Sequence, residues 1–482
     1  MEAREKKKQT LAQGCAIFIV LYMILSMALY FIAGEQFQSR VSEKSITSVD
    51  ATTPVGEILK GDIIEQIFLM ESDILSSISL KFATYGRQNT GTVEVQLIDN
   101  DSNNILFTQT LDVSSFMDNS FITLRPEEPI KDMKEKTVRI AVSSETGTPG
   151  NAVTIWYNAD IQNPGQKLYI KGEPAQGTLC FSVEERDPLF FGKHYFLIMG
   201  SIGLLLTAYC IRIVQCQKTG KKCYGLVLIS TIEKYRFLLQ QLVSRDFKTK
   251  YKRSALGVLW SFLNPLLTMA VQYIVFSTIF KSNIPNFAVY LLVGIVFFNF
   301  FSEATGMGLM SIVGNSSLIT KVYIPKYIFP VSRVLSSAIN LLLSLIPLIL
   351  VVAITGVRFT YAFLLLPFSL ICAVIFCIGM SFILSAAMVY FRDMQFLWGV
   401  ISMLWMYATP IFYPETILPQ NLMVLFKLNP MYHFIRFSRA IILNGASPEP
   451  QAYLLCLIAA FVPLAIGTAV FKKSQNGFVL HI

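Results

Sequence analysis

Long apolar stretches recur along the chain, and eight of them are long enough to cross a bilayer. A helix needs about 20 mainly apolar residues to span the hydrocarbon core. Several of the stretches exceed that length, so tilted helices are expected. The pattern predicts an α-helical polytopic membrane protein with spans at Leu11–Ala33, Phe190–Val214, Ala255–Phe280, Val289–Val313, Tyr327–Ile354, Tyr361–Tyr390, Gln395–Phe412 and Tyr453–Phe471.

A period of two residues marks the segment between the first two spans. Apolar and polar residues alternate in Ile78–Phe82, Val93–Leu97, Val138–Val142 and Val153–Tyr157, as in strands that bury one face. Turn-forming clusters such as YGRQNTG and SSETGTPGN separate these runs. Short strands at this spacing predict an inserted all-β sandwich of the jelly-roll type.

A basic amphipathic helix is predicted before the third span. One of its faces is apolar, and the opposite face is rich in lysine and arginine, which is typical of a helix in the membrane–water interface with its apolar face in the acyl boundary. The alternative is a basic segment that only sets the topology. The apolar face comprises Tyr235, Leu238, Leu239, Leu242, Val243, Phe247 and Tyr251, and the basic face Lys234, Arg236, Arg245, Lys248, Lys250, Lys252 and Arg253.

The distribution of charge predicts the topology. Between Gln215 and Arg253 there are ten Lys and Arg residues against two acids, which places this segment in the cytoplasm. The β-domain is then outside, and both termini are inside. The first apolar run follows a basic head and is interpreted as an uncleaved signal-anchor rather than a signal peptide. The predicted segments are 1–34 (head and first span), 35–188 (β-domain), 189–214 (second span), 215–254 (basic linker and interface helix) and 255–482 (six-span region).

Composition removes several other classes of protein. Hydrophobic residues make up 53% and charged residues 15% of the chain, as in polytopic membrane proteins. The net charge of +9 does not indicate nucleic-acid binding, because the cations cluster beside apolar spans. The three histidines are far apart and there is no C-x-x-C pair, so no metal site is predicted. There is no phosphate-binding G-x-x-x-x-G-K-[ST] loop either, and the cysteines suggest no disulfide framework.

The junction RDFKTKYKRSALGVLWSFLNPLL closely resembles the start of the permease subunits of ABC-2 type exporters of lipid-linked polysaccharides and teichoic acids. The resemblance extends over Ile232–Phe471, and the first two spans and the β-domain are additions to the six-span permease. It implies a cell-membrane permease without enzymatic activity, forming a homodimer that contacts membrane lipids and two ABC ATP-binding subunits. This chain would bind no cofactor, since ATP and Mg would lie on the partner ATPase. The interface helix and substrate entry would comprise Arg245, Asp246, Lys250, Tyr251, Arg253, Trp260, Asn264 and Pro265.

The resemblance also assigns roles to three later segments. The loop Asn315–Leu335 resembles the segment that couples the permease to the ATPase, although an ordinary interfacial loop would have the same pattern. Arg392 and Asp393 in VYFRDMQFLW suggest either contact with the ATPase or a charged helix end. The segment Ala408–Gly445 is too interrupted by proline to span the membrane and resembles the outer mouth of the pathway. Coupling is assigned to Lys321, Tyr323, Pro325, Lys326, Arg392 and Asp393, and the pathway and outer mouth to Glu303, Phe412, Tyr413, Tyr432, Phe434 and Arg436.

The β-domain looks like the carbohydrate-binding type of sandwich. Tyr85, Trp156, Tyr157 and Tyr169 are candidates for stacking on sugar rings, with burial in the core as the alternative for each. Two other functions stay open at this point. One is an ABC-2 exporter of a drug, peptide or simple lipid, and the other is a membrane-anchored glycan-binding receptor or glycan-modifying enzyme. No acid/base pair or nucleophile constellation favours the enzyme.

Overall fold

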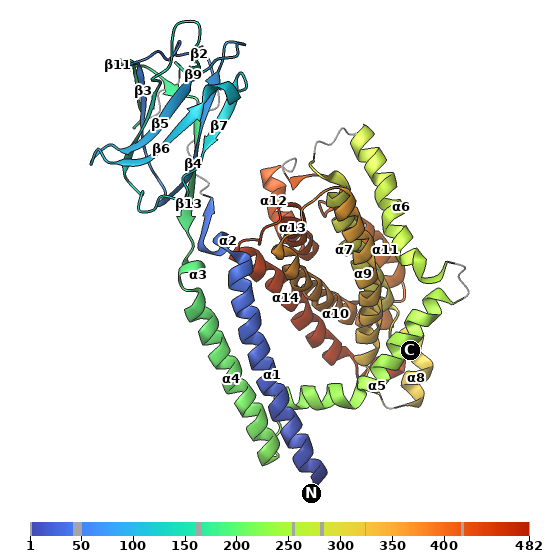
Figure 1. Cartoon of the computed structure of the whole chain (residues 1–482). Helices are drawn as coiled ribbons and strands as arrows, with labels where there is room; N and C mark the ends of the chain where they lie inside the picture. Colours follow the sequence, from blue (N-terminus) through green and yellow to red (C-terminus); the bar gives the residue numbers. More distant parts are fainter. Residues whose placement is uncertain are drawn as a thin grey trace. The chain divides into compact units, whose positions relative to one another are not determined.

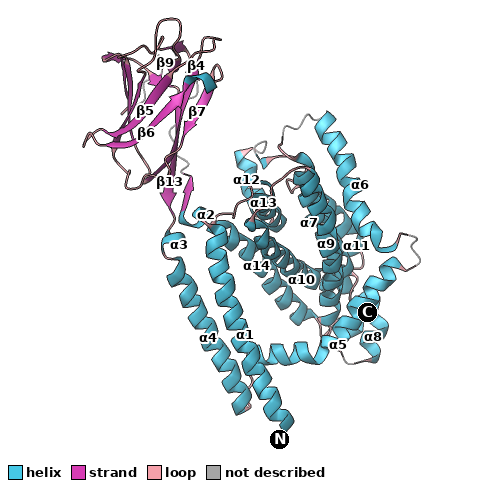
Figure 2. Cartoon of the chain, in the orientation of Figure 1, coloured by secondary structure: helices cyan, strands magenta, loops and turns pink. Residues whose placement is uncertain are grey.

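A computed structural model describes residues 2–41, 51–160, 165–252, 256–279, 284–322, 324–415 and 419–481. The chain forms two compact units. One unit comprises Met1–Gln36 and Phe196–Ile482, and the other comprises Phe37–Tyr195. Figure 1 and Figure 2 show that the first is helical and that the second consists mainly of strands. The predicted combination of a polytopic helical protein with an inserted all-β domain is therefore confirmed.

The β-unit is a sandwich of two sheets. One sheet has the order β1-β13-β4-β9-β12, with β2 paired to β9 and β7 paired to β4, and the other has the order β11-β10-β3-β8-β5-β6. The strands are β1 (Ser39–Val41), β2 (Thr53–Pro54), β3 (Ile63–Leu69), β4 (Ile74–Ala83), β5 (Thr92–Asp99), β6 (Ile105–Asp112), β7 (Ser120–Leu124), β8 (Thr137–Ser143), β9 (Thr154–Asn158), β10 (Lys167–Ile170), β11 (Glu173–Ala175), β12 (Thr178–Leu179) and β13 (Phe181–Pro188).

The alternation in the sequence determines the core of this sandwich. Val95 and Leu97 of β5 and Ile140 of β8 point inward from one sheet, and Leu80 and Phe82 of β4 point inward from the other; all five are buried. Because successive side chains of a strand face opposite sides, the intervening polar residues face away from this core.

The entry and exit of the β-unit lie side by side. β1 and β13 pair antiparallel, with Ser39 opposite Pro188, and the amide of Leu189 donates to the carbonyl of Gln38 at 2.7 Å. The unit extends beyond residue 188, because Phe37 packs edge-on against Phe191 with ring centroids 5.5 Å apart. Phe190–Lys193 forms a separate short helix, α3. The second apolar span, predicted to begin at Phe190, begins at Tyr195.

The helical unit contains the remaining long elements. Short 3-10 or π segments join some of them. Its helices are α1 (Glu2–Ala33), α4 (Tyr195–Thr219), α5 (Tyr224–Tyr251), α6 (Trp260–Ile274), α7 (Phe287–Leu309), α8 (Ser316–Lys321), α9 (Ile328–Ile354), α10 (Leu366–Tyr390), α11 (Met394–Tyr407), α12 (Gln420–Lys427), α13 (Pro430–Leu443), α14 (Pro450–Ser474) and α15 (Phe478–His481), and α2 (Glu35–Gln38) joins the two units.

Among the described residues, seven helices are long and apolar enough to cross a membrane. They correspond to seven of the eight predicted spans. The remaining predicted span, Gln395–Phe412, contains the 14-residue helix α11. This helix is about 21 Å long and so shorter than the roughly 30 Å hydrocarbon core. The helix ends at Tyr407, because Pro410 interrupts the apolar run and cannot continue a helix.

Helix α7 is the centre of the helical unit. Most of its spanning window is buried, whereas little or none of the windows of α1, α4 and α6 is buried. It contacts α6, α9, α10, α11 and α13. Helices α10 and α14 meet backbone to backbone, since a Cβ on Gly467 would lie 2.2 Å from the carbonyl oxygen of Gly379. Small residues permit this close approach, as is common between membrane helices.

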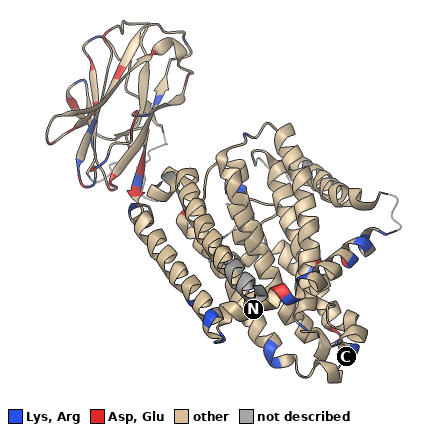
Figure 3. Ribbon diagram, turned by 60° about the horizontal axis from the view of Figure 1, so that its bottom comes forward, with Lys and Arg blue, Asp and Glu red and all other residues tan. Residues whose placement is uncertain are grey.

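The charged positions of the helical unit are unevenly distributed. In Figure 3 many of the Lys and Arg positions gather near the end of α4 and along α5, whereas the spanning lengths of the helices are largely free of charge in the described part of the chain. Such a basic end is the expected cytoplasmic end of a bundle.

Candidate functional site

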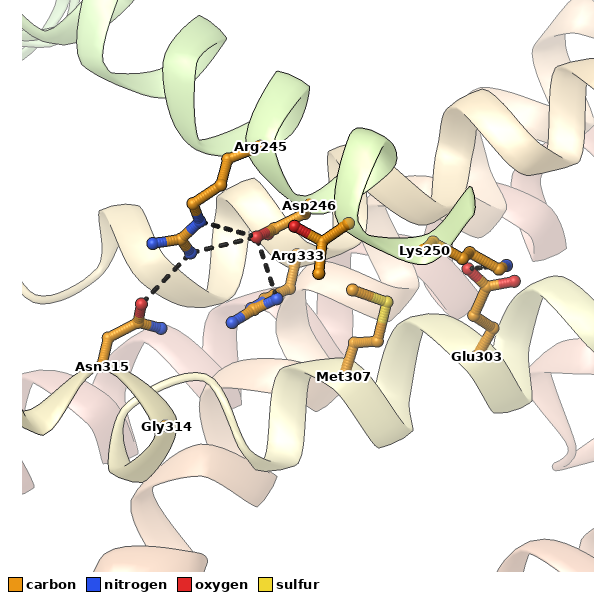
Figure 4. A pocket seen from close by; sticks show the side chains of 9 residues that line it. Arg245, Asp246, Lys250, Glu303, Met307, Gly314, Asn315 and Arg333 are labelled. Atoms are coloured by element: carbon orange, nitrogen blue, oxygen red, sulfur yellow. Dashed lines mark hydrogen bonds and ion pairs between the residues drawn. The ribbon is translucent and has the colours of Figure 1, made fainter. Parts of the chain in front are cut away.

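The candidate site is a cavity of 540 Å³ beneath the second half of α5. Helix α5 supplies one wall, and α7, the turn after it and α9 supply the others (Figure 4). Two carboxylates and three cationic side chains line the cavity, so charged groups gather there although apolar helices surround it. Its lining residues are Arg245, Asp246, Thr249, Lys250, Glu303, Met307, Gly314, Asn315 and Arg333.

The buried carboxylate of Asp246 is the centre of this site. Its side chain is only 3% exposed, and Oδ1 lies 3.0 Å from Nη2 of Arg245 and 3.0 Å from Nη1 of Arg333. Asp246 follows Leu242 by four residues, so both lie on the face of α5 that packs against the protein. A carboxylate on that face is tolerable only when it is paired, and the guanidinium of Arg333, from α9, provides the pairing across the helices.

Asn315 fixes the position of Arg245. Its amide donates to the carbonyl of Ser311 at 2.7 Å, which leaves Oδ1 to accept from Nη2 of Arg245 at 3.2 Å. Arg245 therefore bridges Asp246 and the turn after α7. The side chain of Arg245 is still 47% exposed, so this guanidinium is also accessible to a ligand.

A second ion pair lies about one helical turn further along α5. Nζ of Lys250 is 2.9 Å from Oε1 of Glu303 in α7. The amide of Asn340 in α9 donates to the same oxygen at 2.6 Å. Tyr251 in turn donates its hydroxyl to Oδ1 of Asn340 at 2.8 Å and also hydrogen-bonds to Ser261 of α6. These contacts attach the end of α5 to three helices.

Part of the predicted apolar face of α5 packs against protein. Leu242 is buried in a cluster with Ile328 and Phe329 of α9, and Tyr235 and Leu238 pack against the same cluster. The predicted face exists, and protein covers part of it. Exposed apolar side chains instead lie at Tyr224, Leu228 and Ile232, one turn apart in the first half of the helix.

The remaining predicted entry residues lie at the junction of α5 and α6. Arg253 lies outside the described residues. Gly257 has a φ of +51°, a backbone conformation that glycine adopts readily. Trp260 is 46% exposed at the start of α6, Asn264 accepts from the hydroxyl of Thr268 at 3.4 Å, and Pro265 is buried within the helix.

The predicted coupling residues lie at the end of the helical unit where α5 and α8 lie (Figure 1). Lys321 is exposed at the end of α8, and Tyr323 lies outside the described residues. Pro325 and Lys326 belong to the inner turn Ile324–Tyr327, where Nζ of Lys326 donates to the carbonyl of Gln475 at 2.5 Å. Partial burial lowers the pKa of Lys326.

Arg392 and Asp393 form the neighbouring turn, between α10 and α11. Both are exposed, and the carbonyl of Asp393 accepts from the amides of Phe396 and Leu397 at the start of α11. Their exposure keeps them available to a partner.

The predicted outer-mouth residues divide into buried and exposed groups. Phe412, Tyr432 and Phe434 are 6%, 1% and 0% exposed, so these rings belong to the core and present no surface to a passing sugar. Tyr413 is half-buried and donates its hydroxyl to the carbonyl of Tyr407 at 2.7 Å. Arg436 is 59% exposed and lies 3.6 Å from Glu415.

Glu303 does not belong with this outer group. It pairs with Lys250 of the interface helix. Tyr290 lies at the other end of α7. Its hydroxyl donates to the carbonyl of Tyr413 in the segment Ala408–Gly445, which is called the outer segment below. Thirteen residues separate Glu303 from Tyr290, which is about 20 Å along a helix axis. The sequence shows a carboxylate within an apolar run but does not show which end of the bundle it approaches.

Arg439 is a buried arginine that the predicted site residues do not include. It is 7% exposed and donates to the carbonyls of Tyr290, Pro410 and Ile411 at 2.6–3.3 Å. Its guanidinium stacks on the Tyr290 ring at 3.3 Å. Gly294 makes room for this contact, because a Cβ there would lie 2.8 Å from Ile411. The signal was an arginine within an otherwise apolar helix face.

Asn429 determines the start of α13. Its side chain accepts from the amide of Met431 and from the indole of Trp405 at 2.8 Å, and its amide donates to Thr409 at 2.8 Å. Asn429 is thus the N-cap of α13, with Pro430 at the first helical position, where its missing N–H is no loss. In the described residues no group of three or more His, Cys, Asp or Glu side chains is arranged to hold a metal ion.

The helical part of the chain is similar to known transporter permeases. The model of the family "ABC-2 type transporter" matches residues 238–443. The O-antigen export system permease protein RfbA of Myxococcus xanthus is 33% identical over 258 residues, 53% of this chain and 99% of that protein. RfbA of Klebsiella pneumoniae is 29% identical over 242 residues, 50% of this chain and 93% of the relative.

A more distant relative has the same coverage. The polysialic acid transport protein KpsM of Escherichia coli is 23% identical over 255 residues, 52% of this chain and 98% of the relative. The family match begins within α5 and ends at α13, so it includes the cavity, the inner turn and the outer segment but not the β-unit. This chain is a multi-pass membrane protein that belongs to the ABC-2 type transporter family.

Proposed function

We propose that this chain is the permease subunit of an ABC exporter that moves a lipid-linked cell-surface polysaccharide out of the cytoplasm. The observation that carries the proposal is the 33% identity to an O-antigen export permease over nearly its whole length. Relatives named for polysialic acid and capsule polysaccharide export support the same class of substrate. Hydrolysis of ATP belongs to a separate ATPase chain, and this chain has no catalytic role of its own.

The proposed assembly has two permeases and two ATPase subunits, with ATP and Mg on the ATPase. The basic positions near the end of α4 and along α5 are on the cytoplasmic side, together with both termini, and the β-unit is outside. The excess of Lys and Arg between Gln215 and Arg253 supports this orientation. The exposed windows of α1, α4 and α6 are faces for lipid or for the second permease.

The cavity beneath α5 is the proposed entry for the charged end of the substrate. Arg245 and Lys250 are 47% and 41% exposed and point into it. A phosphate of a lipid-linked glycan can accept from these side chains in place of Asp246 and Glu303. Replacing Glu303 as the partner of Lys250 in this way loosens α5 from α7, so that the helices can move when the ATPase displaces the inner turn.

The test of the proposed function is purification of the complex from its native membrane. An ATPase chain is expected to co-purify in a two-to-two complex, and a lipid-linked glycan is expected to raise the rate of ATP hydrolysis. Stimulation by a drug or simple lipid, but not by the glycan, would favour the other kind of ABC-2 exporter. Purification without an ATPase would favour a glycan receptor.

Reversing the two accessible charges of the cavity is expected to lower export. The double variant Arg245→Glu, Lys250→Glu puts new carboxylates beside Asp246 and Glu303, so like charges replace both ion pairs. We expect export to fall about tenfold or more, since each lost pair also removes a phosphate donor. Surface polysaccharide and the amount of permease in the membrane are the two measurements.

The control for this variant is Lys248→Glu, Lys252→Glu. Both lysines are exposed on the same helix and do not line the cavity, while the change in net charge is identical. Export close to that of the unaltered protein is expected. An equal loss in both variants would mean that the overall charge of α5 matters rather than the cavity.

Removal of the β-unit tests its proposed role in receiving the polymer. Since Ser39 lies opposite Pro188, residues 40–187 can be replaced by a short glycine-serine link without stretching the chain. The helical unit is expected to accumulate normally, with a severalfold change in the amount or chain length of exported glycan, measured by gel electrophoresis. Unchanged amount and length would remove the proposed role.

A further inference from the structure

The inner turn Ile324–Tyr327 is held from two sides. On one side Ile324 and Tyr327 pack against the cluster that contains Leu242 of α5. On the other side Lys326 reaches the residues that follow α14: Nζ donates to the carbonyl of Gln475, and the ammonium lies 5.7 Å from the centre of the Phe478 ring. The turn thus lies between the interface helix and α15.

The contact with Lys326 is also a helix cap. The last carbonyls of a helix have no partner within it, and they form the negative end of the helix dipole. At the end of α14 the carbonyl of Gln475 receives Lys326, and the carbonyl of Ser474 receives the hydroxyl of Tyr390 at 3.0 Å. One side chain from the inner turn and one from the last residue of α10 therefore both meet the end of α14.

One side chain of α15 anchors this arrangement. Phe478 is 0% exposed, and its ring lies 5.2 Å from Phe471 of α14 and 6.3 Å from Tyr390 of α10, measured between centroids. The next two residues, Val479 and Leu480, are 50% and 84% exposed. The short helix α15 thus buries one aromatic ring between the turns and exposes its neighbours.

We propose that α15 is a brace for the inner turn and that Phe478 is a positioning residue for the coupling of ATP hydrolysis to transport. The proposal rests on the proposed function, in which the inner turn receives the push from the ATPase. A four-residue turn has too few internal hydrogen bonds to keep its own shape. When the Phe478 ring is in place, a displacement of the inner turn is transmitted to α5, α10 and α14 together. Without this ring, the inner turn is displaced and the three helices keep their positions.

The variant Phe478→Ala tests the brace directly. It removes the buried ring and leaves every proposed partner-facing residue unchanged. In the purified full-length permease, amide hydrogen exchange over residues 324–329 is expected to accelerate about tenfold. In the complex with its ATPase, the amount of glycan exported per ATP hydrolysed is expected to fall about fivefold while ATP is still hydrolysed. The conservative variant Phe478→Leu should restore most of both quantities.

Leu480→Ala is the matched control. It removes a large apolar side chain from the same short helix, but an exposed one, so neither measurement should change. An effect as large as that of Phe478→Ala would overturn the brace, because it would show that α15 acts through its surface. Tyr390→Phe is the milder variant should Phe478→Ala fail to fold: it removes only the bond to Ser474 and should accelerate exchange about threefold.

The two measurements separate the possible failures. Unchanged exchange in Phe478→Ala and Tyr390→Phe would disprove the brace, whatever the permease transports. Faster exchange with an unchanged export-to-ATP ratio would disprove the positioning role. If the unaltered complex exports no glycan, the proposed function fails, while the exchange experiment still decides whether α15 holds the turn.

Discussion

Replacing Asp246 with alanine is expected to abolish export and to loosen the interface helix. The carboxylate is 3% exposed and pairs with both Arg245 and Arg333. Its removal leaves the largely buried guanidinium of Arg333 without its counter-charge. Breaking a buried pair on one side typically costs about 3–5 kcal/mol, a large effect because the contact joins α5 to α9. Surface polysaccharide and thermal stability of the purified permease measure the two consequences.

Two further variants make the experiment on Asp246 specific. Glu233→Ala removes the other acid of α5, which is exposed, and should change stability by less than about 1 kcal/mol. The double variant Asp246→Ala, Arg333→Leu removes both charges, so most of the lost stability should return. If the double variant is as unstable as the single one, the ion pair is not what holds α5.

Replacing Arg439 with methionine is expected to destabilise the outer segment strongly. The guanidinium donates to the carbonyls of three residues, Tyr290, Pro410 and Ile411. Methionine fills the space of the stem but offers no donor, and each buried carbonyl left unpaired costs about 1–3 kcal/mol. We expect the thermal midpoint to fall by about 5–10 °C and the yield of folded protein to fall with it. Arg439→Lys should be only a partial substitute, since an ammonium lacks the planar fork.

The control for Arg439 lies one turn earlier in the same helix. Arg436 has an exposed side chain near Glu415, and surface pairs of this kind contribute at most about 1 kcal/mol. Arg436→Met should therefore leave the thermal midpoint nearly unchanged. A comparable loss from both substitutions would show that positive charge in α13, rather than the carbonyl contacts of Arg439, stabilises the segment.

Sequence patterns were sufficient for the architecture. The apolar runs predict spans because a bilayer requires an uninterrupted apolar length, and seven described helices meet that requirement. The alternation around Leu80 and Val95 predicts strands with one buried face, and both residues are buried between the sheets. The prolines around Pro410 and Pro414 predict that the following segment does not span, and α12 and α13 are correspondingly short.

The candidate site could be predicted from the sequence only in part. The motif around Arg245 and Asp246 marked the right stretch of chain, but nothing in it indicated Arg333 as the partner. Arg333 lies 87 positions later, in a different helix, and the sequence does not specify the packing of α5 on α9. The same limit applies to α15: an isolated phenylalanine such as Phe478 carries no periodic signal.

The sequence by itself determined which side chains share a face of each helix or strand, where seven of the long apolar helices lie, and which family the six-span region resembles. Only the tertiary structure decided what covers each face. Lipid and protein interior are both apolar, so a face buried in either has the same composition. That is why Leu242 on the apolar side of α5 and the rings of Phe412 and Phe434 were assigned to membrane or pathway and lie instead in the protein core. It is also why Arg436 and Arg439, one turn apart, differ in burial: contacts with α7 and the Pro410 segment enclose only Arg439.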